Sequence, residues 1–325
     1  MRTIHTIDYH TAGEPFRIVT GGVPPLEGRT ILEKRRFAAE RLDHVRRLLV
    51  HEPRGHADMY GCFVTEPEDG GADLGVVFFN NAGYSTACGH GTIALVTWAL
   101  ESGGLEPGER ERRVVVDVPS GRLETVARVE DGDVTHVRFT NVPSFISRQG
   151  MDAAGLTVDV AFGGAFYASV RAPIPVEPSS LPRLIELGRE VKRELEAQQE
   201  FVHPLEPELR DIYGVVFWQP EEEGSPLVQR NVTVFADGEV DRSPCGSGTS
   251  ARLALLDVSG ELARGDELVH QSVIGTEFRA RVVGDAEVGG LPAVITEVEG
   301  SAHFTGRHEF ALDPSDPLPD GFFLR

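Results

Sequence analysis

Apolar runs of two lengths alternate with glycine-rich and charged turns along this chain. Short runs rich in β-branched and aromatic residues, such as 74–79 and 232–235, are typical of buried strands. Each is followed by a longer apolar segment that is typical of a buried helix. We predict these helices at 93–100 and 250–256, with Gly260 just beyond the end of the second.

Local signals predict two further helices and a series of strands. Thr30 and Glu33 have the spacing of a capping box, so a helix should begin after Thr30. Ser180 is expected to cap another helix, which has Pro182 in its first turn. The apolar residues of that helix follow helical spacing at Leu184, Leu187, Val191 and Leu195. The predicted strands are 4–8, 62–65, 114–118, 123–128, 135–139, 267–273, 277–283, 293–299 and 301–305.

Two segments of the chain are near-copies of each other at an offset of 157 residues. Eight of the 18 positions in 88–105 are identical to their counterparts in 245–262. A repeat of this period indicates a duplicated domain rather than a solenoid. We therefore predict two α/β lobes. The N-terminal lobe comprises 1–118 with about 300–325, and the C-terminal lobe comprises 119–299.

Each copy of the repeat places one cysteine between a predicted strand and the start of a predicted helix. These cysteines are Cys88 and Cys245. A cysteine at a helix N-terminus lies at the positive end of the helix dipole, which favours the thiolate and lowers the thiol pKa. The free backbone N–H groups of the next two residues in each copy would form an anion site. Those residues are Gly89, His90, Gly246 and Ser247.

Two thiols on opposite sides of a bound carboxylate can invert the adjacent stereocentre. One thiolate removes the Cα proton while the other thiol delivers a proton from the far face. The amide donors would stabilise the charge that develops on the carboxylate, so no cofactor is needed as an electron sink. The sequence has no glycine-rich nucleotide motif and no P-loop. We therefore expect no cofactor.

Cys88 and Cys245 could instead be buried core residues, zinc ligands or the two halves of a disulfide. Free cysteines are most often small buried residues, but two at equivalent helix starts argue against a role in the core alone. Zinc would require four ligands at tight spacing, and only Cys88 and His90 are close together in the sequence. A disulfide between the two thiols would be an oxidation product of a reactive pair.

Composition and charge exclude several classes of partner. The formal charge of −20, with no basic stripe to offset it, argues against nucleic acid and anionic membranes. Residues 1–10 lack the apolar core of a signal peptide, and no apolar run reaches the length of a transmembrane helix. Three cysteines do not suit a secreted disulfide framework. We expect a cytoplasmic protein.

Several motifs resemble the proline racemase superfamily. Segments 88–93 and 241–251 are similar to its two signatures, and the likeness extends to 10–15, 52–56, 163–164 and 272–276. The resemblance covers nearly the whole chain. It implies a fold like that of diaminopimelate epimerase, with two pseudo-symmetric lobes that each wrap a mixed sheet around a central helix. It also implies an active site in the cleft between the lobes.

The resemblance implies a role for each candidate site residue. Cys88 and Cys245 would be the acid/base pair, and Asp241 would bind the substrate amine. The four residues that follow the cysteines, Gly89, His90, Gly246 and Ser247, would hold the carboxylate. His90 as an exposed turn residue and Asp241 as a turn residue before Pro244 are the alternatives. Tyr60 and Phe235 would line the substrate ring, where proline racemases tend to have two phenylalanines.

Within the family, the residue at position 245 separates the reactions. Dehydratases typically have threonine there, so Cys245 favours epimerisation. The segments 59–61, 164–167, 235–237 and 320–324 instead resemble the dehydratase branch. The hydroxyl of Tyr60 could recognise a ring hydroxyl, although Tyr60 as a plain core residue remains an alternative.

We expect a cofactor-independent 2-epimerase that acts on 3- or 4-hydroxyproline, with proline as a further candidate substrate. The alternatives are a trans-3-hydroxy-L-proline dehydratase, a non-catalytic imino-acid-binding protein and an isomerase of acyclic amino acids. The expected partner is a small imino acid, and a homodimer is left open.

Overall fold

The computed structural model of the chain describes residues 3–222 and 226–324, and the chain divides into two compact units. Unit 1 consists of Met1–Val137 and Ser301–Arg325, and unit 2 consists of Arg138–Gly300. We expected the boundary near residue 118. It lies later because β6 (Gly121–Glu130) pairs along its length with β5 (Glu111–Val118), which keeps this hairpin in unit 1.

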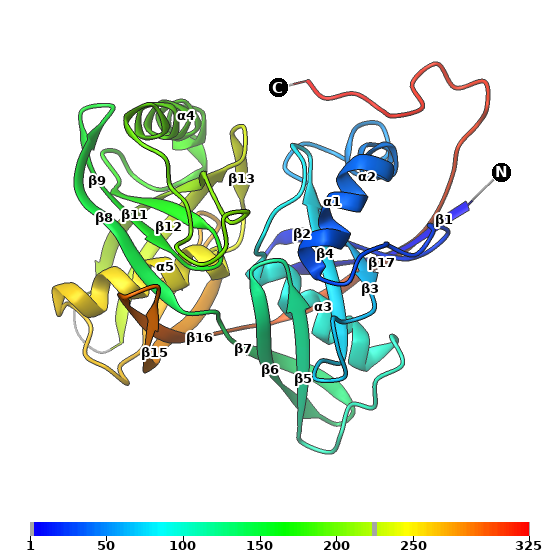
Figure 1. Cartoon of the computed structure of the whole chain (residues 1–325), viewed down its shortest axis with the longest axis horizontal. Coiled ribbons are helices and arrows are strands. Elements are labelled where there is room, and N and C mark those ends of the chain that lie inside the picture. Colours follow the sequence, from blue (N-terminus) through cyan, green and yellow to red (C-terminus); the bar gives the residue numbers. More distant parts are fainter. Residues whose placement is uncertain (1–2, 223–225, 325) are drawn as a thin grey trace. The chain divides into compact units, whose positions relative to one another are not determined.

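Unit 1 is a mixed sheet with three helices (Figure 1). Its strand order is β17-β1-β2-β3-β4-β5-β6, in which β2–β3 and β4–β5 are parallel and the other pairs antiparallel. The remaining elements are β1 (Thr3–Thr11), β2 (Glu14–Gly21), α1 (Ile31–Arg41), α2 (Asp43–Val50), β3 (Tyr60–Thr65), β4 (Leu74–Asn80), α3 (Gly89–Glu101) and β17 (Ala302–Ala311). The C-terminal strand β17 pairs with β1 and so belongs to the sheet of unit 1.

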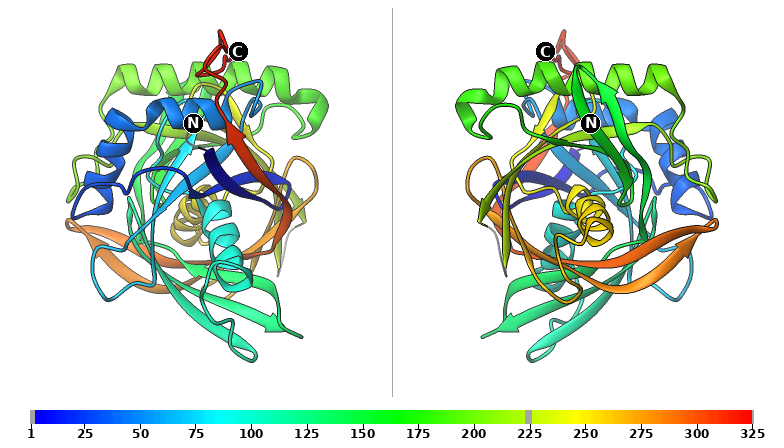
Figure 2. Two further views of the ribbon diagram at one scale, coloured as in Figure 1. Left: turned by 90° about the vertical axis from the view of Figure 1, so that its right-hand side faces the viewer. Right: turned by 90° about the vertical axis from the view of Figure 1, so that its left-hand side faces the viewer.

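Helix α3 is the centre of unit 1. Figure 2 shows it surrounded by strands of the unit, and it contacts β1, β2, β3, β6 and β17. Every residue from Gly89 to Leu100 is buried. A helix that is apolar on all sides is stable only when it is enclosed by other elements. The start of α3 is therefore held in a fixed place by the strands around it.

Unit 2 repeats this plan with a sheet that closes on itself. The strands follow the order β8-β9-β10-β11-β12-β14-β15-β16, and β16 pairs again with β8. Their bounds are β8 (Ser144–Ala153), β9 (Leu156–Phe162), β10 (Phe166–Arg171), β11 (Ile212–Glu222), β12 (Leu227–Phe235), β14 (Leu268–Gln271), β15 (Glu277–Val288) and β16 (Leu291–Gly300). The short strand β13 (Glu239–Asp241) pairs with the end of β12. Strand β7 (Asp133–Thr140) contains the boundary between the units.

Helix α5 (Gly246–Ser259) is the central helix of unit 2 and contacts β8, β9, β10, β15 and β16 (Figure 2). Its residues Gly246–Leu256 are buried. The helix ends at Ser259, and Gly260 lies just beyond its end as predicted, where it forms a left-handed cap with φ +71°. The repeat in the sequence therefore corresponds to two equivalent buried helices, whose first residues are 157 positions apart (246 − 89).

The two predicted helix caps have different outcomes. Thr30 forms the expected capping box with Glu33 at the start of α1. The expectation for Ser180 is wrong, because this residue has an αR backbone and makes no side-chain cap bond. It ends the short 3₁₀ helix Pro178–Ser180, which runs directly into α4 (Leu181–Gln198). The 3₁₀ turn therefore occupies the place where a capping residue would stand.

Candidate active site

Both cysteines of the repeat are the N-cap residues of central helices. Cys88 precedes α3 and Cys245 precedes α5. The exposed fractions of these residues are 6% and 5%. The first N–H groups of a helix have no partner within the helix. Gly89 and Gly246, the first residues of the two helices, therefore stand where an anion site was predicted in each unit.

The Cys88 sulfur lies among nitrogen atoms of its own turn. The backbone N–H of Gly91 donates to Cys88 Sγ at 3.3 Å. The ring nitrogens Nε2 and Nδ1 of His90 lie 3.5 and 3.6 Å from the same sulfur. The Thr92 hydroxyl donates to the carbonyl of Cys88 at 2.9 Å, which fixes the turn. The thiol of unit 1 is therefore held between a backbone donor and an imidazole ring.

His90 is a buried residue rather than an exposed turn residue, with an exposed fraction of 4%. Its ring makes edge-to-face contacts with Tyr60 at 4.9 Å and with Phe16 at 5.6 Å. Burial lowers the pKa of His90 to about 3, so the imidazole is neutral at pH 7. The Tyr60 hydroxyl donates to Ser85 Oγ at 2.5 Å. The predicted unit 1 residues Tyr60, Cys88 and His90 thus form one cluster.

The Cys245 sulfur lies among hydroxyl groups. Cys245 has φ +62°, a left-handed backbone that a residue with a side chain rarely adopts. Its N–H donates to Ser243 Oγ at 3.1 Å, and its Sγ lies 3.8 Å from the Tyr167 hydroxyl. The Tyr167 hydroxyl also forms a hydrogen bond with Ser247 Oγ at 2.7 Å. Strained backbone conformations are common at functional sites, and these hydrogen bonds stabilise the left-handed conformation of Cys245.

Asp241 lies beside Cys245 at the end of β13. Its Oδ1 accepts the N–H of Ser243 at 2.8 Å. Burial raises the pKa of Asp241 to about 6, against hydrogen bonds from Ser243 and Cys245 that lower it. The carboxylate is therefore mostly ionised at pH 7 and can meet a cationic amine.

The expectation of a lowered thiol pKa is wrong for Cys245. Burial, and then the negative charge of Asp241, raise the pKa of this thiol to about 12. Bonds from Thr233, the N–H of Gly248 and Tyr167 act in the opposite direction. Loss of solvent therefore outweighs the helix field at this thiol.

Phe235 is connected to this cluster through other aromatic rings. It stacks on Tyr213 at 5.6 Å, and Tyr213 makes an edge-to-face contact with Tyr167 at 5.8 Å. Our site prediction omitted Tyr167 and Ser85. Tyr167 closely follows the Gly163–Gly164 pair that resembles the family, and this position is the signal that could have identified it.

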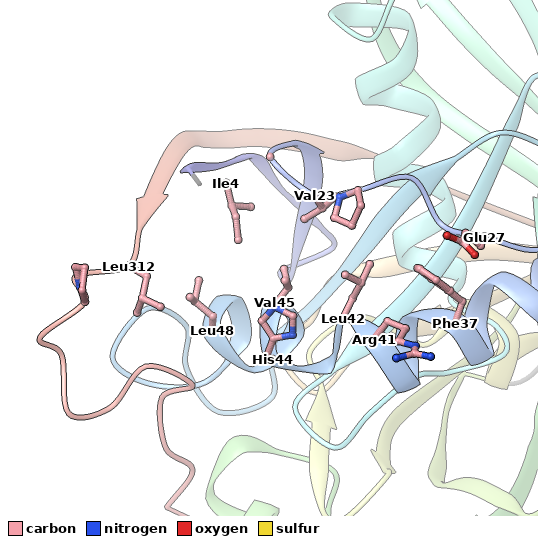
Figure 3. A pocket seen from close by; sticks show the side chains of 13 residues that line it. Ile4, Val23, Glu27, Phe37, Arg41, Leu42, His44, Val45, Leu48 and Leu312 are labelled. Atoms are coloured by element: carbon pink, nitrogen blue, oxygen red, sulfur yellow. The ribbon is translucent and has the colours of Figure 1, made fainter. Parts of the chain in front are cut away.

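Unit 1 also contains a pocket that lies away from the predicted site residues. It has a volume of about 800 Å³ and lies beside α1, α2 and β1 (Figure 3). Its lining is mostly apolar and includes Ile4, Phe37, Val45, Leu48 and Leu312. None of the described residues that line it is a predicted site residue.

Metal-binding clusters and membrane-spanning helices are both absent from residues 3–222 and 226–324. Within these ranges, no three His, Cys, Asp or Glu side chains are grouped so that they could hold a metal ion. Nor does any helix in this part of the chain have the length and apolar character needed to cross a bilayer.

Comparison with known proteins identifies the family. The model of the proline racemase family matches residues 6–323. A Burkholderia ambifaria protein named trans-3-hydroxy-L-proline dehydratase is 47% identical over 333 residues, covering 100% of this chain and 99% of that protein. A Burkholderia multivorans protein named 3-hydroxyproline 2-epimerase has the same identity and coverage.

A solved structure is also similar over almost the whole chain. It is a hydroxyproline epimerase from Agrobacterium vitis with bound trans-4-hydroxy-L-proline, 33% identical, with a TM-score of 0.91. The alignment covers 99% of this chain and 96% of that one. The expected α/β fold class is confirmed. Since both the family model and these relatives match the chain from end to end, the chain belongs to the proline racemase family of enzymes.

Proposed function

We propose that the chain is a cofactor-independent epimerase that inverts Cα of hydroxyproline, with Cys88 and Cys245 as its two acid/base groups. The observation that carries this proposal is the equivalence of the two thiols. Each is the buried N-cap of the central helix of its own unit. Inversion without a cofactor needs two such groups, one for each face of the substrate.

In the proposed reaction, both half-sites act on one substrate. The carboxylate is bound by N–H groups at the starts of α3 and α5, where Gly89, His90, Gly246 and Ser247 lie. Asp241 binds the substrate ammonium. One thiolate takes the Cα proton and becomes a thiol, and the other thiol gives its proton to the opposite face. The N–H groups stabilise the charge that builds up on the carboxylate.

The substrate itself contributes to the acidity of Cys245. In the free protein, the Asp241 charge is the second largest cause of the raised pKa of this thiol. A bound ammonium group neutralises that charge. The thiolate is therefore more accessible in the complex than in the free enzyme.

Tyr60 and Phe235 are proposed to contact the substrate ring. The Tyr60 hydroxyl donates to Ser85, so its oxygen is oriented to accept a hydrogen bond from a ring hydroxyl. A site that hydrogen-bonds a ring hydroxyl disfavours proline, whose ring has no hydroxyl. The bound ligand of the Agrobacterium vitis epimerase supports a hydroxylated imino acid as the substrate class.

The second candidate is dehydration of trans-3-hydroxy-L-proline, which is favoured by the names of several relatives. Dehydration needs one base at Cα and a donor for the leaving hydroxyl. Cys88 would be the base, and Cys245 or His90 would assist departure of the hydroxyl. Cys245 favours the epimerase, because a second thiol is necessary only for inversion.

The test is incubation of the purified protein with proline and each 3- and 4-hydroxyproline isomer in D₂O. We expect a hydroxyproline to be converted to its C2 epimer with one deuterium at Cα, as seen by NMR. Accumulation of a cyclic imine that reacts with an amine-trapping reagent would assign the dehydratase. Calorimetric binding without exchange or imine formation would contradict both, and exchange of diaminopimelate alone would indicate an acyclic substrate.

A further inference from the structure

The Tyr167 hydroxyl stands between the sulfur of Cys245 and the hydroxyl of Ser247. Its distances to Cys245 Sγ and Ser247 Oγ are 3.8 and 2.7 Å. All three residues are buried, and the exposed fraction of Tyr167 is 1%. Tyr167 lies on β10, whereas Cys245 is the N-cap of α5 and Ser247 lies in the first turn of that helix. The contact thus joins a strand to the start of the helix.

The Cys245 thiol, the Tyr167 hydroxyl and the Ser247 hydroxyl form a row of three groups, each of which can both donate and accept a hydrogen bond. Their hydrogen atoms therefore have two consistent arrangements. When Cys245 is a thiol, its S–H donates to Tyr167, and the Tyr167 O–H donates to Ser247. The hydrogen of Ser247 then points elsewhere. When Cys245 is a thiolate, the Tyr167 O–H turns to the sulfur, and the Ser247 O–H turns to Tyr167.

We propose that Tyr167 is a positioning residue that couples the protonation state of Cys245 to a hydrogen bond from the Ser247 hydroxyl to the substrate carboxylate, in addition to the bonds from the backbone N–H groups. This inference rests on the proposed function, in which Cys245 alternates between acid and base. Tyr167 supports both states of the sulfur, because its hydroxyl accepts from the thiol and donates to the thiolate.

The coupling acts at the moment when the carboxylate needs it. When Cys245 acts as the base, the C–H bond at Cα breaks, its proton goes to Sγ, and its electron pair stays on the substrate. Tyr167 then accepts from the new thiol and donates to Ser247, which releases the Ser247 hydrogen toward the carboxylate. The two hydroxyl groups only rotate, and neither gives up its proton. A bond that forms as charge develops accelerates the reaction more than one present throughout.

Unit 1 has no hydroxyl at the equivalent position. The counterpart of Ser247 at the 157-residue offset is His90, whose ring nitrogens lie directly beside the Cys88 sulfur. The coupling therefore belongs to Cys245, and Cys88 provides an internal control in the same molecule.

The first test measures the thiols without any substrate. We expect Tyr167→Phe to slow iodoacetamide alkylation of Cys245 at fixed pH by about tenfold, because loss of a hydrogen bond to a charged group destabilises the thiolate. The Cys88 rate, read from its own peptide by mass spectrometry, should be unchanged. Tyr84→Phe, which removes a half-buried tyrosine hydrogen bond to the Ala38 carbonyl, should change neither rate. An unchanged Cys245 rate, or equal loss at both cysteines, would overturn the proposal.

The second test is a double-mutant cycle on turnover. Tyr167→Phe and Ser247→Ala should each lower kcat by about 10-fold to 100-fold, and the double variant should lose little more than the worse single variant. Multiplicative losses would show independent roles and would overturn the coupling. If the natural protein turns over no imino acid, the proposed function fails, whereas the alkylation result still decides whether Tyr167 controls Cys245.

Discussion

At Cys245, burial and the helix field act on the thiol in opposite directions. The sequence places the cysteine at a helix N-terminus, which favours the thiolate. The structure adds a nearly complete loss of solvent and the Asp241 carboxylate, and these raise the pKa. Short-range sequence signals report the helix start but not the depth at which it is buried. The acidity of this thiol could therefore not be predicted from the motif.

Replacing Asp241 should separate stability from activity. Its pKa is raised from 3.8 to about 6 in the folded protein, so the ionised carboxylate costs the folded state about 3 kcal/mol at pH 7. Below pH 3.8, the pKa in the unfolded protein, the carboxyl group is protonated in both states and this cost is absent. The cost grows as the pH rises from there through the folded pKa of about 6. We expect Asp241→Asn to raise the free energy of unfolding in urea at pH 7 by up to that amount, and by little near pH 4. An equal gain at both pH values would contradict this assignment.

The same change should abolish binding of the substrate ammonium, with a loss in kcat/KM of at least about 100-fold. In the natural protein, kcat/KM should rise with pH through about 6 as Asp241 ionises. A pH profile of the natural protein that is flat from about pH 5 to pH 7 would mean that Asp241 does not bind the amine.

Cys245→Thr should change the reaction rather than remove all chemistry. Threonine cannot act as the second thiol, so epimerisation should fall by at least about 1,000-fold, roughly the upper part of the range for a general acid or base. Removal of the Cα proton by Cys88 should remain. Imine formation from trans-3-hydroxy-L-proline would then equal or exceed that of the natural protein. Cys88→Thr should abolish both reactions, and retention of imine formation in that variant would contradict the roles of the two thiols.

At the scale of elements, the first turn of α3 has no space for a side chain at position 91. A Cβ on Gly91 would lie 2.4 Å from the Phe16 ring and 2.6 Å from Cys88 Sγ. At the equivalent Gly248, the nearest atom is Cys245 Sγ at 3.0 Å. The glycine of unit 1 is therefore necessary for the position of the thiol, and that of unit 2 less so.

We therefore expect Gly91→Ala to lower kcat/KM by about 100-fold, because a small displacement of a catalytic group is costly. Its free energy of unfolding should fall by about 1–3 kcal/mol through overpacking. Gly248→Ala should have a smaller effect on both quantities. A Gly91→Ala variant with normal kcat/KM would show that the Cys88 position is not constrained by this turn.

The two caps give a matched pair of stability variants. Thr30→Ala removes the side-chain bond to the Glu33 N–H and should lower the free energy of unfolding by about 1 kcal/mol. Ser180→Ala removes no cap bond and should change it by less than about 0.5 kcal/mol. Equal losses would contradict the difference between the two helix starts. Neither change should affect turnover.

These cases show which parts of the fold and site could be predicted. The capping box at Thr30 is a local pattern of two residues, so the sequence contains all the information it needs. The prediction of a side-chain cap at Ser180 was wrong because the preceding 3₁₀ turn depends on how the chain enters α4. Tyr167 was missed for a related reason. It meets Cys245 only through pairing of distant strands, and 78 residues separate the two positions.

At the scale of the whole molecule, the duplication is the feature that connects sequence, fold and proposed function. Each unit encloses one buried helix and presents one N-cap cysteine. The surroundings of the two thiols differ, with an imidazole beside Cys88 and hydroxyl groups beside Cys245. We propose that each half supplies one face of a two-sided reaction, so neither half should invert a substrate alone.

The most direct measurement of this claim is Cα exchange in D₂O with the natural protein, Cys88→Ser and Cys245→Ser, followed by NMR and chiral chromatography. We predict that the natural protein converts a hydroxyproline to its C2 epimer with deuterium at Cα, and that each serine variant loses inversion by at least about 1,000-fold. Undiminished inversion in either variant, or no exchange by the natural protein with any hydroxyproline isomer, would contradict the two-thiol account.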